Sequence, residues 1–219
     1  SRGNVINPDD IVRDYGADTL RLYEMFMGDF QSAAPWSMNS VRGCKRFLDR
    51  IWRLQNCVVD GDAYRPELES SFHKTIRKVS EDIESLKFNT AIAAMMSLLN
   101  EIEAVGSINK KEYRDLLVML NPFAPHITEE LFEEMGFGSP ITSQSWVTYD
   151  PEKCVDATVE IAVQLSGKVR ARIQVPADIE AADAIALAKA DPKIASAIEG
   201  KTIVKEIYVK GKLVNIVAK

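Results

Sequence analysis

Four arginines that follow Trp36 are spaced like residues on one face of a helix. The intervals from Arg42 to Arg46, Arg50 and Arg53 are 4, 4 and 3 residues, and residues three or four apart lie above one another in an α-helix. Guanidinium groups bind phosphate through paired hydrogen bonds. A stripe of them indicates contact with a nucleic-acid backbone. The alternative interpretation is a solvated helix face.

The same predicted helix carries one further cation, one acid and an apolar stripe. Lys45 lies near the edge of the arginine stripe. Asp49 is the only acid within residues 39–58, so it alone offsets the positive charge of this predicted helix. The apolar stripe, on a different side of the helix, consists of Phe47, Ile51, Leu54 and Val58. This separation predicts a helix that buries its apolar side and leaves its arginines accessible.

A second group of cations lies on a predicted β-hairpin near the C-terminus. Apolar and polar residues alternate over 159–165 and again over 168–175, which is the period of strands with one buried face. The polar positions of the second strand include Lys168, Arg170 and Arg172, and we expect them on one face. Further lysines follow at Lys201, Lys205, Lys210 and Lys212. These cations form a second candidate surface for phosphate contact, again with a solvated face as the alternative.

The register of this hairpin can be predicted from its faces. Residues directly opposite one another in an antiparallel pair share a face, so a two-residue turn would place the apolar Leu165 opposite Lys168. A three-residue loop over 165–167, with Gly167 in the left-handed conformation, avoids that mixture. The opposite pairs predicted in this way are Gln164–Lys168, Ala162–Arg170 and Glu160–Arg172.

Helical periodicity extends over most of the chain before residue 136. We expect helices at 8–15, 17–27, 39–58, 67–86, 90–105, 110–120 and 127–135, and the nearly all-apolar segment 90–105 should be buried. Gly138, Pro140 and Pro151 mark an irregular link that would allow two domains to swing. Beyond it, helices at 179–190 and 192–200 and strands at 202–209 and 213–217 complete a small α+β domain with the hairpin.

The predicted fold class is therefore a mainly α-helical bundle followed by a small α+β domain. We divide the chain into connecting helices at 1–36, the bundle at 37–150 and the C-terminal domain at 157–219. The whole chain of 219 residues has a net charge of −5, yet the C-terminal domain holds ten Lys and Arg against seven Asp and Glu. A basic domain on an acidic body is a hint of a polyanionic partner.

The residue types argue against catalysis within this chain. Its three cysteines are too far apart for a Cys-x-x-Cys zinc site, and His73 and His126 are its only histidines. We interpret His126, in a corner with two prolines, as a capping or packing residue. Phosphate-binding loops, dinucleotide fingerprints and nucleophile elbows are missing. We expect a binding module with no catalytic residue and no metal ligand, in a reducing, cytoplasmic compartment.

Several segments together resemble a known family. The stretch 1–23, SRGNVINPDDIVRDYGADTLRLY, resembles the segment that follows the Lys-Met-Ser-Lys-Ser signature of class I aminoacyl-tRNA synthetases, with Ser1 as its last serine. The stretches 23–28 and 34–37 resemble the leucyl-tRNA synthetase family within that class. The segment 164–173, QLSGKVRARI, with 175–178 and 211–217, is similar to the C-terminal domain of its bacterial members. Leu165-Ser166 departs from the valine-asparagine common there.

This resemblance implies the role of a C-terminal fragment. The family joins leucine to tRNA(Leu) through a leucyl-adenylate, using ATP and Mg²⁺, and its bundle is of the anticodon-binding type. Ser1, Arg2, Gly3 and Asn4 would be the remnant of the loop that holds ATP phosphates. The nucleotide-binding core and the editing domain lie outside this chain, so we expect no activity and no bound cofactor. The implied partners are tRNA(Leu) and the rest of the synthetase, with no membrane, and we expect a monomer.

The candidate tRNA-binding residues rest on charge and position. They are Arg42, Lys45, Arg46, Arg50, Arg53, Lys168, Arg170, Arg172, Lys201 and Lys205. Two alternatives stay open at the level of sequence. One is a stand-alone helical RNA-binding or scaffold module, and the other is the corresponding part of a valyl- or isoleucyl-tRNA synthetase, against which the segment 164–173 argues.

Overall fold

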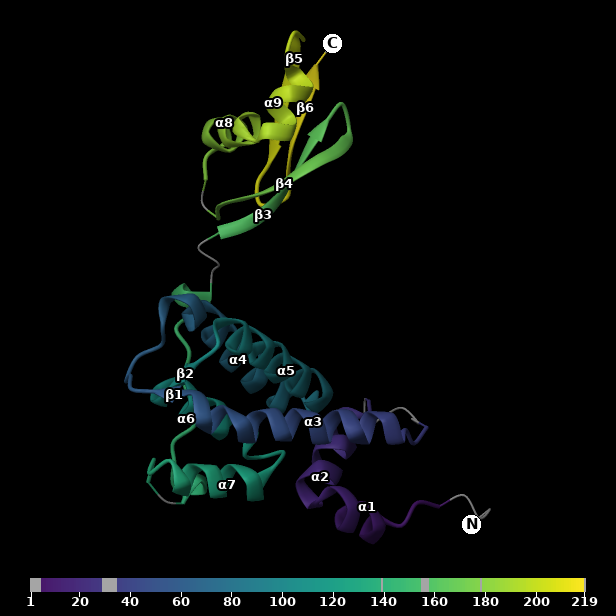
Figure 1. Ribbon diagram of the computed structural model, residues 1–219, viewed down its shortest axis with the longest axis vertical. Coiled ribbons are helices and arrows are strands. Elements are labelled where there is room, and N and C mark those ends of the chain that lie inside the picture. Colours follow the sequence, from purple (N-terminus) through teal and green to yellow (C-terminus); the bar gives the residue numbers. More distant parts are fainter. Residues whose placement is uncertain (1–4, 29–34, 139, 155–157, 178, 219) are drawn as a thin grey trace. The chain divides into compact units, whose positions relative to one another are not determined.

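The computed structural model describes residues 5–28, 35–138, 140–154, 158–177 and 179–218. The chain divides into two compact units, Ser1–Cys154 and Val155–Lys219. Figure 1 draws the elements of the first unit in purple to teal and green, and those of the second in green to yellow. Each unit has its own hydrophobic core, and each is described by itself.

The first unit is built from helices. These are α1 (Pro8–Tyr15), α2 (Ala17–Phe26), α3 (Met38–Leu54), α4 (Pro66–Glu84), α5 (Phe88–Val105), α6 (Lys110–Leu120) and α7 (Pro125–Glu134). Short 3-10 turns lie at η1 (Gln55–Cys57), η2 (Ile141–Ser143) and η3 (Pro151–Cys154), and the two-residue strands β1 (Val58–Val59) and β2 (Ile108–Asn109) pair in parallel. The helix predicted to reach residue 58 ends at Leu54 because Val58 pairs with Ile108 instead.

Local capping explains where several of these helices begin. The side chains of Asn7 and Ser37 accept hydrogen bonds from backbone amides in the first turns of α1 and α3. Asn109 and Glu112 form a reciprocal capping box at α6. Each of these contacts satisfies amides that have no partner inside the helix. The sequence therefore specifies these starts within a few residues.

Apolar positions at helical spacing give the first unit one continuous core. Helix α5 contributes Ala91, Ile92, Met95, Leu98, Leu99 and Ile102, all fully or almost fully buried. The expectation of burial for the segment 90–105 is therefore met on one face only, because the opposite face of the helix is exposed. It packs against α4 over much of its length, as Figure 1 shows. Met95 lies within the core, where its flexible side chain fills space. Residues from α1 and α2, such as Ile11 and Leu22, belong to the same core.

The segment 140–154, which we call the connecting segment, packs on the first unit. Its Ile141 and Val147 are buried in the core of that unit. The Trp146 indole Nε1 donates a hydrogen bond to Ser80 Oγ on α4 at 2.8 Å. The backbone amide of Asp150 donates to His73 Nδ1, also on α4, at 3.0 Å. The segment lacks long helices and strands, as expected for an irregular link, and Trp146 and Asp150 hold it against α4. The swing expected at the link stays a prediction.

The second unit is a four-stranded sheet with two helices. Its elements are β3 (Thr158–Leu165), β4 (Lys168–Pro176), α8 (Ala181–Ala190), α9 (Pro192–Ile198), β5 (Ile203–Val209) and β6 (Leu213–Ala218). The strand order is β4-β3-β6-β5, with β3 and β6 parallel and both outer pairs antiparallel. Ala184, Ala188 and Ile194 of the helices pack with Ile161 and Val214 of the sheet, so the helices cover one face (Figure 1).

The predicted register of the hairpin is wrong. Strands β3 and β4 join through a two-residue turn with Leu165 opposite Lys168 and Gln164 opposite Val169. Ser166 and Gly167 have φ values of 50° and 83°, the left-handed conformations that such a turn requires. The pairing then shifts by one residue between Val163 and Gln164. This bulge brings the apolar residues of the two strands back to one face of the sheet. The predicted register assumed strict alternation and therefore did not include a bulge.

The predicted fold class is confirmed. A mainly helical unit precedes a small unit of mixed α and β structure, and helix boundaries agree with expectation to within a few residues, apart from the end of α3. Among the described residues, no helix is long and apolar enough to cross a membrane.

Candidate nucleic-acid interface

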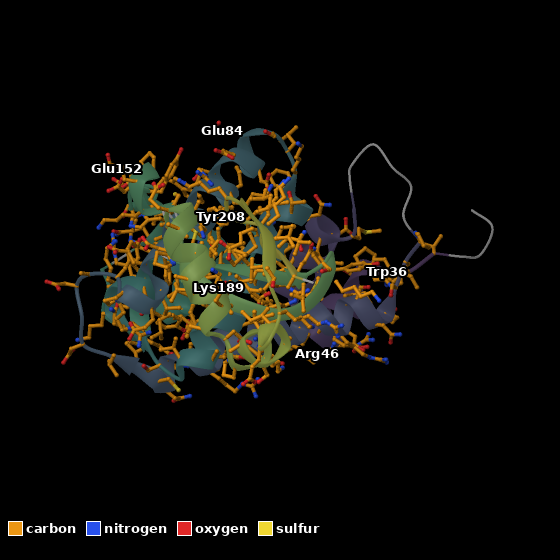
Figure 2. The ribbon with its side chains drawn as sticks, turned by 90° about the horizontal axis from the view of Figure 1, so that it is seen from above. Trp36, Arg46, Glu84, Glu152, Lys189 and Tyr208 are labelled. Carbon is orange, nitrogen blue, oxygen red and sulfur yellow. The ribbon has the colours of Figure 1, made fainter. Side chains whose placement is uncertain are left out.

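Helix α3 separates its apolar and basic sides as the sequence predicts. Its buried residues are Val41, Cys44, Phe47, Leu48, Ile51 and Leu54. Arg42, Arg46 and Arg53 are exposed, and Arg46 is labelled in Figure 2. None of the three has a carboxylate partner among the described residues. We call these three residues the α3 stripe, because their guanidinium groups are available to an external anion.

Arg50 is occupied by a neighbouring helix. Its Nη2 lies 2.6 Å from Glu103 Oε2 and 2.6 Å from Asn100 Oδ1, and its Nε lies 2.9 Å from Glu103 Oε1. The hydrogen bond that Arg50 donates to Glu103 raises the pKa of Arg50 and lowers the pKa of Glu103. Lys45 is also paired, with Asp49 one turn later on α3. The contacts of Arg50 join α3 to α5, which spacing within α3 does not reveal, whereas the Lys45 pair lies within one helix.

The bulge distributes the cations of the hairpin over two faces of the sheet. Arg172 lies on the face away from the helices, where its Nη1 is 2.8 Å from Glu160 Oε1. Lys205 on β5 lies on that same face, since its neighbour Glu206 faces the helices and pairs with Lys189 of α8. Arg170, at the bulge, borders α9 instead. The expectation that Lys168, Arg170 and Arg172 share one face is therefore not met.

Lys201 follows α9 and lies near its C-terminal end. Its Nζ donates a hydrogen bond to the carbonyl oxygen of Ala197 at 2.9 Å, a favourable place for a cation. Lys168 begins β4 directly after the turn and is exposed. Lys193, a residue that the sequence reasoning did not select, also lies near Arg170. It stands on a helix of seven residues, too short for its periodicity to indicate which way a side chain points.

Other basic residues of the first unit gather around a cavity of about 460 Å³. Lys110, Lys111 and Arg114 line it. Lys110 pairs with Asp60, Lys111 pairs with Asp115, and Arg114 Nη2 donates to Gln144 at 3.0 Å. Because every one of these cations already has a partner, this cavity is a weaker candidate for an anion than the α3 stripe.

The Cys44 thiol and the His126 imidazole occupy structural positions. Cys44 is buried, which raises the pKa of its thiol to about 11 and makes it unreactive at neutral pH. His126, expected to cap or pack, has a side chain that is 74% exposed, and its Nδ1 lies 2.7 Å from Asp18 Oδ1. Within the described part of the chain, no cluster of three or more His, Cys, Asp or Glu could hold a metal ion. The residues Ser1, Arg2, Gly3 and Asn4 lie outside the described ranges.

Residues 66–186, from the start of α4 into α8, match the family described as the anticodon-binding domain of tRNA ligase. The chain belongs to this family. The chain is also 53% identical, over all of its 219 residues, to the leucine–tRNA ligase of Alkaliphilus oremlandii (strain OhILAs). It spans 27% of the length of that relative.

A solved structure is similar to this chain over nearly its whole length. It is the agnB2 LeuRS–tRNA–LeuAMS ternary complex of Agrobacterium radiobacter K84, with a TM-score of 0.75 and 26% identity. The similarity covers 99% of this chain and 31% of that one. The resemblance to leucyl-tRNA synthetases that the sequence indicates is thereby confirmed.

Proposed function

We propose that this chain is the tRNA-binding part of a leucine–tRNA ligase, the enzyme that attaches leucine to tRNA(Leu) through a leucyl-adenylate. The observation that carries the proposal is the 53% identity with a leucine–tRNA ligase over every residue of the chain. The whole enzyme would supply the catalytic core, with ATP and Mg²⁺, and the editing domain. We assign no catalytic or cofactor-binding residue within the described ranges, so the chain alone should bind tRNA without aminoacylating it.

The binding surface of the first unit is the α3 stripe. Arg42, Arg46 and Arg53 are exposed and unpaired among the described residues, so each is free to exchange water and counterions for an RNA phosphate. Arg50 and Lys45 contribute mainly positive potential, because carboxylates already hold their charged groups. This narrows five candidate cations on α3 to three direct contacts.

In the second unit the proposed contacts are Lys168, Arg170, Lys201 and Lys205, with Arg172 contributing less because Glu160 neutralises it. The partners of the whole protein would be tRNA(Leu) and the remaining domains of the synthetase, and we propose that the chain acts as a monomer in the cytoplasm. Its three free cysteines agree with a reducing compartment.

The decisive experiment measures binding of the chain to tRNA(Leu), and to a tRNA with a short variable arm, across a series of salt concentrations. We expect the logarithm of the association constant to fall linearly with the logarithm of the salt concentration. Arg46→Ala should reduce that slope by about one unit if Arg46 contacts one phosphate. Absence of salt-dependent binding would overturn the proposal. ATP–pyrophosphate exchange by the chain alone should be undetectable, and clear exchange would contradict the assignment of catalysis to other domains.

A further inference from the structure

The bulge in the β3–β4 hairpin places Arg170 apart from the other cations of its strand. Val163 pairs with Ala171 and Gln164 pairs with Val169, so Arg170 has no residue directly opposite. An extra residue of this kind redirects its own side chain and increases the local twist. Arg170 thereby leaves the face that carries Arg172 and borders α9.

A cavity of about 470 Å³ lies between this end of the hairpin and α9. We call it the α9 cavity. The residues around it that matter here are Leu165, Arg170, Lys193, Ser196, Glu199 and Lys201. It is as large as common small-ligand pockets, which leaves room for a phosphate and part of an adjoining nucleotide. Three of these residues are cations that come from separate places in the sequence: the bulge, the start of α9 and the segment after α9.

The charge in the α9 cavity is not balanced from within. Arg170 and Lys193 have no carboxylate partner among the described residues, and Lys201 bonds to a neutral carbonyl oxygen. Among the lining residues that the structure describes, Glu199 is the one acid. The cavity bordered by Lys110, Lys111 and Arg114 in the first unit differs, because each of those cations is already paired. Unpaired cations converging on a concave surface attract a phosphate more strongly than scattered surface lysines do.

We propose that the α9 cavity binds a phosphodiester group of an RNA backbone. Arg170 from the hairpin and Lys193 from α9 supply its positive charge, Lys201 adds a third cation, and the exposed Ser196 offers a hydroxyl donor. Glu199 opposes binding and limits its strength, which keeps the contact reversible. The proposal rests on the proposed function, because it takes tRNA as the RNA that reaches this cavity.

The test uses fluorescence anisotropy with labelled tRNA(Leu) and the full 219-residue chain. Lys193→Ala and Arg170→Ala should each weaken binding by about three- to tenfold near 0.1 M salt and reduce the salt slope by about one unit. Lys193→Arg should restore most of the affinity. The matched control is Lys87→Ala, which removes one exposed cation between α4 and α5 and should change affinity by less than about twofold.

Glu199→Gln is a variant for which we expect stronger binding, a result that misfolding of the chain would not produce. Removing this negative charge without changing the size of the side chain should strengthen tRNA binding by about two- to threefold. If the unaltered chain binds tRNA with the expected salt dependence, but the variants at positions 170, 193 and 199 all behave like Lys87→Ala, the α9 cavity proposal is overturned and the proposed function stands. If the unaltered chain does not bind tRNA, the proposed function itself fails.

Discussion

The first unit and the second unit treat their cations differently. In the first unit most described lysines and arginines lie within 4 Å of a carboxylate: Arg13, Lys45, Arg50, Arg65, Lys78, Lys110, Lys111, Arg114 and Lys153. In the second unit only Arg172 and Lys189 are paired in this way among the described residues. Similar residue types are therefore mostly paired with carboxylates in the first unit and mostly without such a partner among the described residues of the second.

This difference teaches which cations to test for RNA contact. A paired cation must give up its carboxylate before it can bind a phosphate, and that exchange brings little net energy. An unpaired, exposed cation exchanges only water and small ions. In the first unit the α3 stripe gathers three exposed cations without a carboxylate partner among the described residues on one helix, and the α9 cavity is its counterpart in the second unit.

The largest effect is expected from removing the α3 stripe. The triple substitution of Arg42, Arg46 and Arg53 by alanine should lower the affinity for tRNA(Leu) by roughly ten- to one-hundredfold near 0.1 M salt, and should reduce the salt slope by about two to three units. Titration by anisotropy measures both quantities. Because all three side chains are exposed, the denaturation midpoint should stay nearly constant. An unchanged slope would remove α3 from the interface.

The next effect concerns the turn that supports the bulge. Gly167 has a φ of 83°, and a Cβ added there would meet nothing within 4 Å. The cost of Gly167→Ala is therefore backbone strain alone, about 1–2 kcal/mol. Hydrogen exchange of the β3 and β4 amides should accelerate, while exchange in α3 should not change. Ser166→Asn, at a position with φ of 50°, should slow exchange in the same strands because asparagine tolerates that conformation better.

Arg50→Ala is expected to have a smaller effect than the preceding changes. It should lower stability and leave tRNA binding unchanged, the reverse of what we expect for substitutions in the α3 stripe. Loss of the contacts with Glu103 and Asn100 should lower the free energy of unfolding by about 0.5–1 kcal/mol, as for other partly exposed ion pairs. The salt slope of tRNA binding should stay within experimental error of the unaltered chain. A slope reduced as much as for Arg46→Ala would show that pairing does not withhold an arginine from RNA.

The smallest effect concerns His73, whose pKa responds to burial and to the nearby Lys153, a cation paired with Glu69. Burial, with the nearby Lys153 ammonium adding to it, lowers the pKa of His73. The unfolded chain then binds the proton more readily, so this contribution to stability is complete above the unfolded-state pKa of about 6.5 and is lost as the pH falls through the lower folded-state pKa. Protonation at Nδ1 would also remove the acceptor used by the Asp150 amide.

Denaturant unfolding at about pH 7.5 and at about pH 5.5 measures this dependence. The unaltered chain should lose more stability on acidification than His73→Asn, whose side-chain oxygen can accept the same hydrogen bond without titrating. Equal losses of stability for the two proteins would show that protonation of His73 does not weaken the attachment of the connecting segment.

Sequence periodicity predicted the α3 stripe more accurately than the hairpin surface. A helix keeps its pitch, so intervals of 4, 4 and 3 residues fixed the side of α3 on which the arginines lie. In a strand one extra residue reverses every later position, and the shift at Gln164 did so without any glycine or proline to mark it. The partner of Arg50 could not be predicted either, because Glu103 lies 53 residues away in the sequence.

The start of helix α7 depends on a residue of α2, which lies far from α7 in the sequence. Its N-cap residue, Ala124, offers no side-chain hydrogen bond. Instead Asp18 of α2 accepts a hydrogen bond from the backbone amide of Ile127 at 2.7 Å, across 109 residues of sequence. A contact at such separation forms only after a long loop has closed, which carries a large entropic cost. Helix α7 is therefore expected to consolidate late in folding, once α2 has been docked and its carboxylate is in place.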